Sequence, residues 1–558
     1  MISDMDAQER IIMNNTKARI ALTYAPSEQQ FLPVPPLGIS ALSQHLINHG
    51  IDNDVVDLEL ELWLSKNGET SEYAQKSVDE LEIDKLPIDA LIPVLDNYDI
   101  VTFSIMGKRQ LAYVMAIARK LKKSHRHKSI VLGGAFFNDK NGIDVINTWK
   151  EIIDYVIVGE GWSPMLALIS SLVDGIRRYD IPGVVCIGEN GESVYNKGTS
   201  WSGDLPIPNY RGINKQGYVL QQSKLYGFQD DSIIYHILVG DRRCPYRCSF
   251  CRISENTKSV KGPTDIADEM IELNKQCGAD RFSLVCNEMN PTKQYYEEFL
   301  DRLLSYDKKL YWFSYLRPNK LDRETLMKAR RAGCVLIRYG VETGSQKILD
   351  HMNKVLYVDE MEQIMKDTHE AGIWNHINIV TGYLHEDEKD VQLTLDFLDR
   401  NKDYIDSVRV NPFYVPIGSP IHNNPGKYGI TLRKNTGSYV QFDEPLRSWE
   451  EKQVWIKKVT DTILKKCIEC EINFAGILPF LVAAVVAHFD DVKTAKEWIK
   501  QNHSYLFLPV SPDTAKWRLA HPDRLDVEIN KWSEIAGKRS SNYQTLSDMN
   551  DDAEEDSY

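Results

Sequence analysis

Cys244-Pro245-Tyr246-Arg247-Cys248-Ser249-Phe250-Cys251 sets three cysteines in a Cys-x3-Cys-x2-Cys pattern within one short stretch. The apolar run at 232–240, three residues before it, is typical of a buried strand, so the cysteines are predicted to lie on the loop at that strand's carboxyl end. Open α/β sheets and barrels place their functional sites at this end of the strands. The stretch therefore predicts a binding loop at the edge of a parallel sheet.

The three thiolates of this loop can hold one face of a metal centre, but the loop supplies no fourth ligand. Catalytic metal sites keep an open position, whereas structural sites close it. A four-iron four-sulfur cluster with one open iron fits this pattern. Two alternatives remain, a zinc site completed by a distant ligand and a chance cluster of buried cysteines. Zinc sites favour paired Cys-x2-Cys knuckles, and this stretch holds one such pair.

Composition and charge disfavour several classes of protein. The 558 residues allow roughly three or four domains of about 150 residues each. A net charge of −14 argues against nucleic acid as the main partner, because phosphate binding needs basic surface. No run approaches the ~20 apolar residues of a membrane span, and no signal peptide is recognisable. Nine cysteines, three of them clustered, do not look like a secreted disulfide framework, so a cytoplasmic location is expected.

The N-terminal third alternates apolar strands with helices. This order predicts an α/β domain with a doubly wound, flavodoxin-like parallel sheet. No complete G-x-G-x-x-G follows the first strand, so a dinucleotide ligand is disfavoured. The predicted strands are 18–24, 54–57, 98–104, 129–134 and 155–161.

The central region repeats a strand and a helix six times, beginning with the strand before Cys244. Six such units predict a partial (β/α)6 barrel whose site lies at the carboxyl ends of the strands. The five strands after the first are predicted at 281–285, 310–315, 335–340, 376–382 and 406–410.

The cysteine stretch resembles the cluster loop of the radical S-adenosylmethionine (SAM) superfamily, down to the aromatic residue before the last cysteine. The resemblance implies that Cys244, Cys248 and Cys251 bind a 4Fe-4S cluster. SAM would then chelate the open iron through its amino and carboxylate groups. One electron, from a donor such as flavodoxin or ferredoxin, would release a 5′-deoxyadenosyl radical.

Polar residues that follow successive barrel strands extend the resemblance. The segment 340–345 looks like the family's Gly-Ile-Glu-Ser-Gly-Ser string, and 415–420 like its last-strand proline turn. The family's usual Gly-Gly-Glu string is absent, and Asn287-Glu288 occupies its place. Each residue alone could equally be a strand-end cap or part of a surface ion pair. The SAM contacts implied are Asn287, Glu288, Arg317, Glu342, Thr343, Gly382, His385 and Glu386.

The N-terminal domain resembles the cobalamin-binding domain that precedes one branch of radical SAM enzymes. The matching strings are Pro-Pro-Leu-Gly at 35–38, Leu-Gly-Gly at 132–134 and Val-Gly-Glu-Gly at 158–161. The D-x-H-x-x-G string is absent, which implies cobalt without a protein histidine. Met106 could lie near cobalt or be an ordinary packed side chain. The cobalamin contacts implied are Leu37, Gly38, Ser104, Met106, Gly133, Gly134, Gly159 and Glu160.

Six segments are predicted along the chain. The C-terminal helical segment is expected to cap the barrel mouth, and its Cys467 and Cys470 to be ordinary helix cysteines. The segments are a lead-in (1–17), the cobalamin-binding domain (18–179), a connector (180–231), the radical SAM barrel (232–425), a helical domain (426–536) and an acidic disordered tail (537–558).

The resemblance implies a cobalamin-dependent radical SAM enzyme. The expected reaction is methylation of an unactivated carbon or phosphorus through a 5′-deoxyadenosyl radical and methylcobalamin. The alternatives are a non-methylating radical reaction (ring contraction, cyclisation or dehydration), with or without cobalamin, a cofactor-binding sensor without turnover, and a zinc protein. Small-molecule, lipid and peptide substrates all remain open, and no catalytic residue is assigned.

Overall fold

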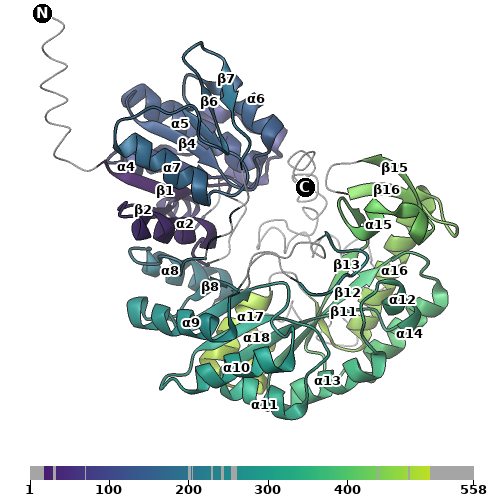
Figure 1. Cartoon of the computed structure of the whole chain (residues 1–558). Helices are drawn as coiled ribbons and strands as arrows, with labels where there is room; N and C mark the ends of the chain where they lie inside the picture. Colours follow the sequence, from purple (N-terminus) through teal and green to yellow (C-terminus); the bar gives the residue numbers. More distant parts are fainter. Residues whose placement is uncertain are drawn as a thin grey trace, which may run out of the picture. The chain divides into compact units, whose positions relative to one another are not determined.

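The computed structural model of the chain describes residues 18–28, 33–69, 71–198, 201, 203, 205–227, 230–239, 244–252, 261–435, 439–474 and 478–502. The predicted lead-in and acidic tail, and residues 503–536 of the predicted helical domain, lie outside these ranges. The chain divides into two compact units after Gly217, within helix α8 (Lys215–Tyr226) (Figure 1).

The first unit is built on a seven-stranded sheet in the order β2-β1-β3-β4-β5-β6-β7. Its first five strands pair in parallel. The order 2-1-3-4-5 is flavodoxin-like and puts the topological switch point between β1 and β3. The predicted doubly wound sheet is therefore confirmed. The parallel strands are β1 (Ile20–Tyr24), β2 (Asp54–Asp57), β3 (Ile100–Ser104), β4 (Ser129–Gly133) and β5 (Tyr155–Ile157).

Helices cover both faces of this sheet. On one face, Leu46 of α2 and Leu168 of α7 share an apolar cluster with Leu22. On the other face, α3 to α6 form a second cluster that contains Ile117 and Ile146. Burial on both faces explains why the strands are apolar throughout rather than alternating. The helices are α2 (Leu37–Asn48), α3 (Leu58–Ser65), α4 (Ile92–Leu95), α5 (Lys108–Ser124), α6 (Asp139–Trp149) and α7 (Trp162–Val173), and short 3-10 turns lie at Glu72–Gln75, Val78–Glu80, Ile83–Lys85 and Asp89–Leu91.

Part of the predicted connector belongs to this sheet. Strands β6 (Val184–Ile187) and β7 (Ser193–Tyr195) form an antiparallel hairpin, and β6 pairs with β5 at the edge of the parallel strands. Asn190 and Gly191 lie in the hairpin turn, and Gly191 adopts a φ of 80°, as a glycine at a tight turn readily does. The expectation that 180–231 is all connector is therefore wrong for the hairpin, whose Asn-Gly turn was the missed signal.

The second unit is built on a parallel sheet in the order β17-β13-β12-β11-β10-β9-β8. Strands β8 and β17 are both edges, so the barrel is open. The partial barrel is confirmed, with the two-residue strand β17 beyond the six predicted. The strands are β8 (Ile234–Leu238), β9 (Arg281–Val285), β10 (Tyr311–Leu316), β11 (Cys334–Glu342), β12 (Trp374–Thr381), β13 (Ser407–Pro412) and β17 (Asn473–Phe474).

Helices between these strands lie outside the curved sheet (Figure 1). Side chains at their first residues fix where several begin, because they accept hydrogen bonds from otherwise unpaired backbone amides. Asp322 accepts from the Thr325 amide in this way, and Ser345 from the Ile348 amide. The helices are α9 (Pro263–Cys277), α10 (Lys293–Leu304), α11 (Arg323–Arg331), α12 (Gln346–His351), α13 (Val358–Glu370) and α14 (Glu388–Arg400).

The C-terminal region is helical, as predicted, but a small antiparallel sheet precedes its helices. Strands β14 (Val415–Pro416), β16 (Tyr439–Asp443) and β15 (Thr431–Asn435) pair in that order. The purely helical prediction for the residues from 426 onward is therefore wrong for β15 and β16. The helices are α15 (Pro420–Asn423), α16 (Trp449–Glu469), α17 (Leu478–Phe489) and α18 (Val492–Asn502), and a 3-10 turn lies at Pro425–Tyr428.

Helices α17 and α18 cover the amino-terminal end of the barrel, not its mouth at the carboxyl ends of the strands. The Phe480 ring lies 5.3 Å from the ring of Phe313 in the first half of β10. Asp490, between the two helices, forms an ion pair with Lys309, which lies just before β10; Lys309 Nζ is 2.7 Å from Asp490 Oδ2. The expected capping of the mouth is therefore wrong for residues 478–502.

Lys452 of α16 carries a buried charge that ties this helix to the barrel. Lys452 and Glu444 are both fully buried, and Lys452 Nζ lies 2.7 Å from Glu444 Oε1 and 2.9 Å from the Tyr383 carbonyl. Lys452→Met should lower the free energy of unfolding by about 3 kcal/mol, because it leaves the Glu444 carboxylate buried with its main partner removed. Urea denaturation followed by circular dichroism measures the loss. The control, Lys457→Met, removes a 77% exposed charge from the same helix. Equal unfolding midpoints for the two variants would contradict the assignment.

Candidate active site at the mouth of the barrel

The cysteine loop leaves β8 and is anchored by segments distant in sequence. The Ser249 amide donates to the Met352 carbonyl at 2.9 Å, and the Ile421 amide donates to the Ser249 carbonyl at 3.0 Å. Ser249 Oγ and the Tyr383 hydroxyl form a buried hydrogen bond of 2.7 Å. The loop is therefore held by residues that follow α12, β12 and β14.

The loop sulfurs are reduced and largely shielded from water. Cys248 is 6% exposed, and Cys244 and Cys251 are half-buried. No disulfide joins any of the described cysteines. Burial raises the pKa of the Cys244 thiol to about 11, so a thiolate there needs a cationic centre beside it.

The donor set of the loop suits a cluster. Within the described ranges, no three His, Cys, Asp or Glu side chains converge as ligands of a single metal ion. Thiolates are the ligands that iron–sulfur clusters take, each on its own iron, and three leave one iron open. The loop therefore fits a 4Fe-4S cluster on the chemistry of its donors.

Arg317, after β10, braces this loop. Its Nη1 donates to Cys248 Sγ at 3.8 Å, and its Nη2 donates to the Lys354 carbonyl. Its guanidinium also stacks 3.5 Å from the centre of the Tyr246 ring. Arg317 is 6% exposed, and its Nε has no hydrogen-bond partner in the described structure. This side chain therefore positions Cys248 directly and holds the loop through Tyr246.

Glu288, after β9, presents a buried carboxylate to the same loop. The Cys244 thiol donates to Glu288 Oε2 at 3.8 Å, whereas Oε1 has no hydrogen-bond partner among the residues described. Burial raises the pKa of Glu288 to about 7, although Arg317 and Lys320 oppose the change. Its neighbour Asn287 is exposed. Glu288 is thus free to accept a hydrogen bond from a ligand at the loop.

Glu342, at the end of β11, has a backbone conformation that is rare outside glycine. Its φ is +69°, and the pairing of β11 with β12 shifts register between Gly340 and Glu342. Its Oε1 lies 2.5 Å from Lys354 Nζ. Both groups lie over Gly340, where an added Cβ would come within 2.7 Å of Oε1 and 2.9 Å of Nζ. Strain of this kind is typical of functional sites.

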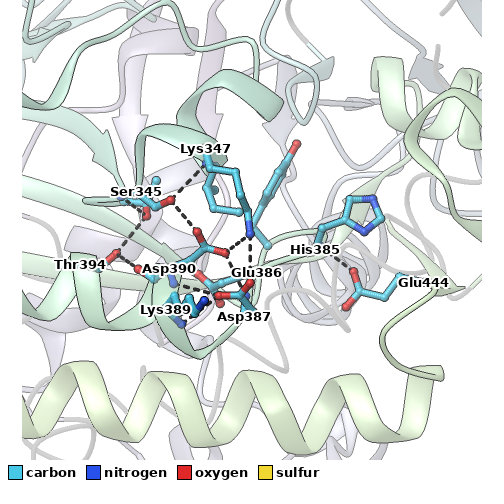
Figure 2. A network of polar contacts seen from close by, with 12 residues as sticks. Ser345, Lys347, His385, Glu386, Asp387, Lys389, Asp390, Thr394 and Glu444 are labelled. Carbon is cyan, nitrogen blue, oxygen red and sulfur yellow. Dashed lines mark hydrogen bonds and ion pairs between the residues drawn. The ribbon is translucent and has the colours of Figure 1, made fainter.

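The other four predicted SAM residues, Thr343, Gly382, His385 and Glu386, make polar contacts with one another's neighbours. Figure 2 shows His385 and Glu386 in the network that also contains Asp390 and Thr394 of α14. Thr343 Oγ1 lies 2.9 Å from Thr394 Oγ1, and Glu386 accepts from the Gly382 amide at 2.8 Å. His385 contacts the Tyr428 carbonyl at 2.8 Å through Nε2. None of these contacts involves the cysteine loop, so the role of this group toward SAM stays a prediction.

Sequence reasoning missed the residues that connect the predicted ones. Lys354 joins Arg317 to Glu342 from a loop that carries no motif. Asn290 is fully buried, and it accepts from the Arg317 amide at 2.9 Å while donating to the Arg317 carbonyl at 3.0 Å. Only the position of Asn290 shortly after β9 could have suggested it.

The eight predicted cobalamin residues all lie at the carboxyl edge of the first sheet or in the helix starts beside it. Ser104 and Gly133 are paired at the ends of β3 and β4. Gly159 and Glu160 follow β5, and Leu37 and Gly38 begin α2. In open α/β sheets, ligands bind along this edge.

Met106 lies in the loop after β3, beside the switch point. It is 44% exposed, so the alternative of a packed methionine is wrong. Its amide donates to Gln110 Oε1 at 2.6 Å, and Gln110 Nε2 donates to the Ala25 carbonyl at 2.7 Å. Gln110, which sequence reasoning missed, thus joins the loops after β1 and β3.

The glycines at this edge have different structural reasons. Gly134 adopts a φ of +114°, and an added Cβ would come 2.2 Å from the Ile105 carbonyl oxygen, so it lets two loops pass closely. Gly38 and Gly159 have no atom within 4 Å of an added Cβ. These two leave open space beside the backbone, which fits a large cofactor on this edge.

Comparisons with known proteins give the following relatives. The model of the radical SAM superfamily matches residues 240–398. An anaerobic magnesium-protoporphyrin IX monomethyl ester cyclase of Rubrivivax gelatinosus is 24% identical over 249 residues, 43% of this chain and 44% of that protein. An uncharacterized methyltransferase of Pyrococcus horikoshii is 21% identical over 353 residues, which cover 61% of this chain and 73% of the methyltransferase. The chain thus spans less than half the length of the cyclase.

Solved structures share the fold over most of the chain. The cobalamin-dependent SAM radical enzyme OxsB, with aqua-cobalamin bound, has a TM-score of 0.56 at 15% identity and covers 97% of this chain and 85% of its own. The radical SAM methyltransferase TsrM of Kitasatospora setae, with cobalamin and a 4Fe-4S cluster bound, has a TM-score of 0.52 at 14% identity and covers 87% and 100%. In the described ranges, no helix has both the length and the apolar character to cross a bilayer.

Removal of the Arg317 guanidinium tests its role as a brace. Arg317→Gln should retain iron about 10-fold less well, because residues that orient metal ligands typically contribute that much to affinity. The measurement is iron per chain after anaerobic reconstitution and incubation with a chelator. Arg323→Gln, which removes a 65% exposed arginine after the same strand, should retain iron as the unchanged protein does. Equal iron loss from both variants would contradict the bracing role.

Proposed function

We propose that this chain, which belongs to the radical SAM superfamily, is a cobalamin-dependent enzyme whose 4Fe-4S cluster is held by Cys244, Cys248 and Cys251. The observation that carries the proposal is the three-cysteine loop at the barrel mouth, with Glu288 and Arg317 each 3.8 Å from one of its sulfurs. The cluster and SAM together supply an electron and the 5′-deoxyadenosyl radical that removes a substrate hydrogen atom.

The SAM-binding roles follow from what each side chain offers. Glu288 Oε1 accepts a hydrogen bond from the SAM ammonium or from a ribose hydroxyl. Arg317 keeps the three cysteines in place, and Lys354 holds the Glu342 carboxylate over the barrel interior. Asn287 adds an exposed amide beside Glu288. Thr343, Gly382, His385 and Glu386 shape the neighbouring strand ends and reach SAM only at the edge of its site.

The first unit, in this proposal, binds cobalamin along its carboxyl edge. The open space at Gly38 and Gly159 supports this, as does the exposure of Met106 at the switch point. Gly134 and Gln110 fix the loops that would line the cofactor.

The reaction we infer is methyl transfer to an unactivated carbon or phosphorus. The similarity to the Pyrococcus horikoshii methyltransferase and to TsrM supports methylation. The similarity to the anaerobic cyclase supports a second candidate, a radical cyclisation without methyl transfer. In both reactions the chain binds and orients the reactants and excludes water around the radical. The electron donor we propose is a flavodoxin or ferredoxin, and the nine described cysteines without disulfides support a reducing compartment such as the cytoplasm.

Loss of one cluster cysteine should abolish radical formation but not cobalamin binding. The protein is reconstituted with iron, sulfide and cobalamin and given a reductant and SAM with a deuterated methyl group. The unchanged protein should release 5′-deoxyadenosine and pass the labelled methyl to cobalamin. Cys248→Ala should lower 5′-deoxyadenosine formation by about 100-fold or more, because three thiolates are needed to hold a cluster with one open iron, yet it should keep cobalamin.

The outcomes separate the candidates. Persistent 5′-deoxyadenosine formation by Cys248→Ala would refute the cluster assignment. Radical formation without any methyl label on cobalamin would favour cyclisation over methyl transfer. Zinc in place of iron would refute the proposed function as a whole.

A bulky side chain at the carboxyl edge of the first sheet should prevent cobalamin binding without changing the iron content. Gly38→Trp fills space that is open in the structure, so the fold should tolerate it, while the bound cobalamin should fall to under about a tenth by steric exclusion. Absorbance after gel filtration measures the cobalamin, and iron content should not change. The control is Lys123→Trp, which changes an exposed residue in the last turn of α5, away from the carboxyl edge of the sheet. Equal cobalamin in both variants would contradict a site on this edge.

A further inference from the structure

Several polar side chains project from the barrel strands into the interior below the mouth. In a strand, every second side chain lies on the same face. Tyr315 pairs with Arg338 across β10 and β11, and Arg338 pairs with His376 across β11 and β12. Gly340, beneath the Glu342–Lys354 pair, lies on the same face as Arg338 and two residues nearer the mouth. Arg338 is therefore about 6–7 Å deeper in the barrel than this pair.

Arg338 has an unusual environment for a half-buried cation. Its guanidinium stacks 4.1 Å from the centre of the Tyr315 ring, which fixes its orientation. No ion pair joins Arg338 to a carboxylate within the described part of the chain, and its buried Nε lacks a hydrogen-bond partner there. A buried cation costs free energy unless an anion or hydrogen-bond acceptors compensate it.

His376, on the adjacent strand, adds a second donor without an acceptor. It is 1% exposed, and its Nδ1 lies 2.8 Å from Ser407 Oγ. Ser407 Oγ also accepts from Trp374 Nε1 at 2.9 Å. The Ser407 oxygen can accept from the indole and still donate its own hydrogen to His376 Nδ1, and in the tautomer that uses this hydrogen bond the ring hydrogen lies on Nε2. His376 Nε2 is buried and unpartnered in the described structure.

The charges around this pair are all of one sign. Arg409 of β13 pairs with Asn378, two residues beyond His376 on β12, and so lies on the same interior face. Burial, followed by Arg338 and Arg409, lowers the pKa of His376 well below its usual value, so the imidazole is a neutral donor. The repulsion between Arg338 and Arg409 also lowers the pKa of Arg338, after burial. The charged groups of the described residues that act on His376 are thus the two arginines, Arg338 and Arg409.

We propose that Arg338 and His376, with Arg409 beside them, bind an oxyanion of the substrate, a carboxylate or a phosphate, inside the barrel. The inference rests on the proposed function, in which the single carboxylate of SAM is taken by the cluster iron at the mouth. A second anion is then needed for donors that lie deeper. A purely structural role explains the stacking on Tyr315 and the bond to Ser407, but not two buried nitrogen atoms that have no partner among the described residues. The substrate is thus an anionic molecule, held with its oxyanion toward the barrel interior.

The test uses small aromatic probes on the reconstituted protein. Phenyl phosphate and benzoate represent the two oxyanions, and benzyl alcohol is the neutral counterpart. Isothermal titration calorimetry should detect the anions and not the alcohol, and the tighter anion identifies which group the site prefers. Arg338→Gln should weaken anion binding at least about 10-fold, because it removes the charge-assisted hydrogen bonds. Arg338→Lys should weaken it less, because it keeps the charge but not the planar donor pair. Arg323→Gln is the exposed control.

The same samples separate this inference from the proposed function. Arg338→Gln that keeps its circular dichroism spectrum and its iron, but loses anion binding, would support the oxyanion site. If the protein binds the anions but holds no iron and cleaves no SAM, the proposed function would be refuted and the oxyanion site would still stand. Equal binding of the alcohol and the anions, no binding of either anion, or equal anion affinity in Arg338→Gln and the unchanged protein would overturn the inference.

Discussion

The contact of the Arg317 guanidinium with the cysteine loop is the interaction on which the site depends. One side chain reaches Cys248 Sγ, the Lys354 carbonyl and the Tyr246 ring, so it connects the loop after β8 to the ends of β10 and α12. Three thiolates that share one cluster have to converge from their loop, and preorganisation of that loop favours this. The rigid strands of the barrel supply that conformation through Arg317.

Polarity changes in layers along the barrel. Sulfur ligands and the Glu288 carboxylate lie at the mouth, the Glu342–Lys354 pair lies over the interior, and the donors Arg338 and His376 lie deeper. The Phe480 ring of α17 packs against the first half of the strands. In the function proposed above, these layers would serve metal ligation, recognition of a zwitterion, recognition of an anion and exclusion of water in turn.

Local pattern predicted most of the fold. Continuous apolar strands between helices predicted both parallel sheets, and both are present. The errors fell on short strands whose pairing is antiparallel: the hairpin β6–β7 and the strands β15 and β16. Strands this short carry too few residues for a periodicity to show, and their pairing at the edge of an existing sheet is a tertiary event. The sequence also did not predict that α17 lies at the amino-terminal end of the barrel, because an apolar helix does not specify which apolar surface it covers.

By itself, the sequence determined the cysteine loop and the strand ends that carry polar residues, because both depend on neighbours within a few positions along the chain. It thereby determined the resemblance to radical SAM enzymes and the edge of each sheet where ligands are expected. Only the tertiary structure decided which of these residues meet. It joined Lys354 to Arg317 and Glu342, paired Thr343 with Thr394 of α14 and Glu386 with the Gly382 amide, and placed His376 beside Arg338. Those contacts depend on strand register and on burial, and both are set by residues tens of positions apart.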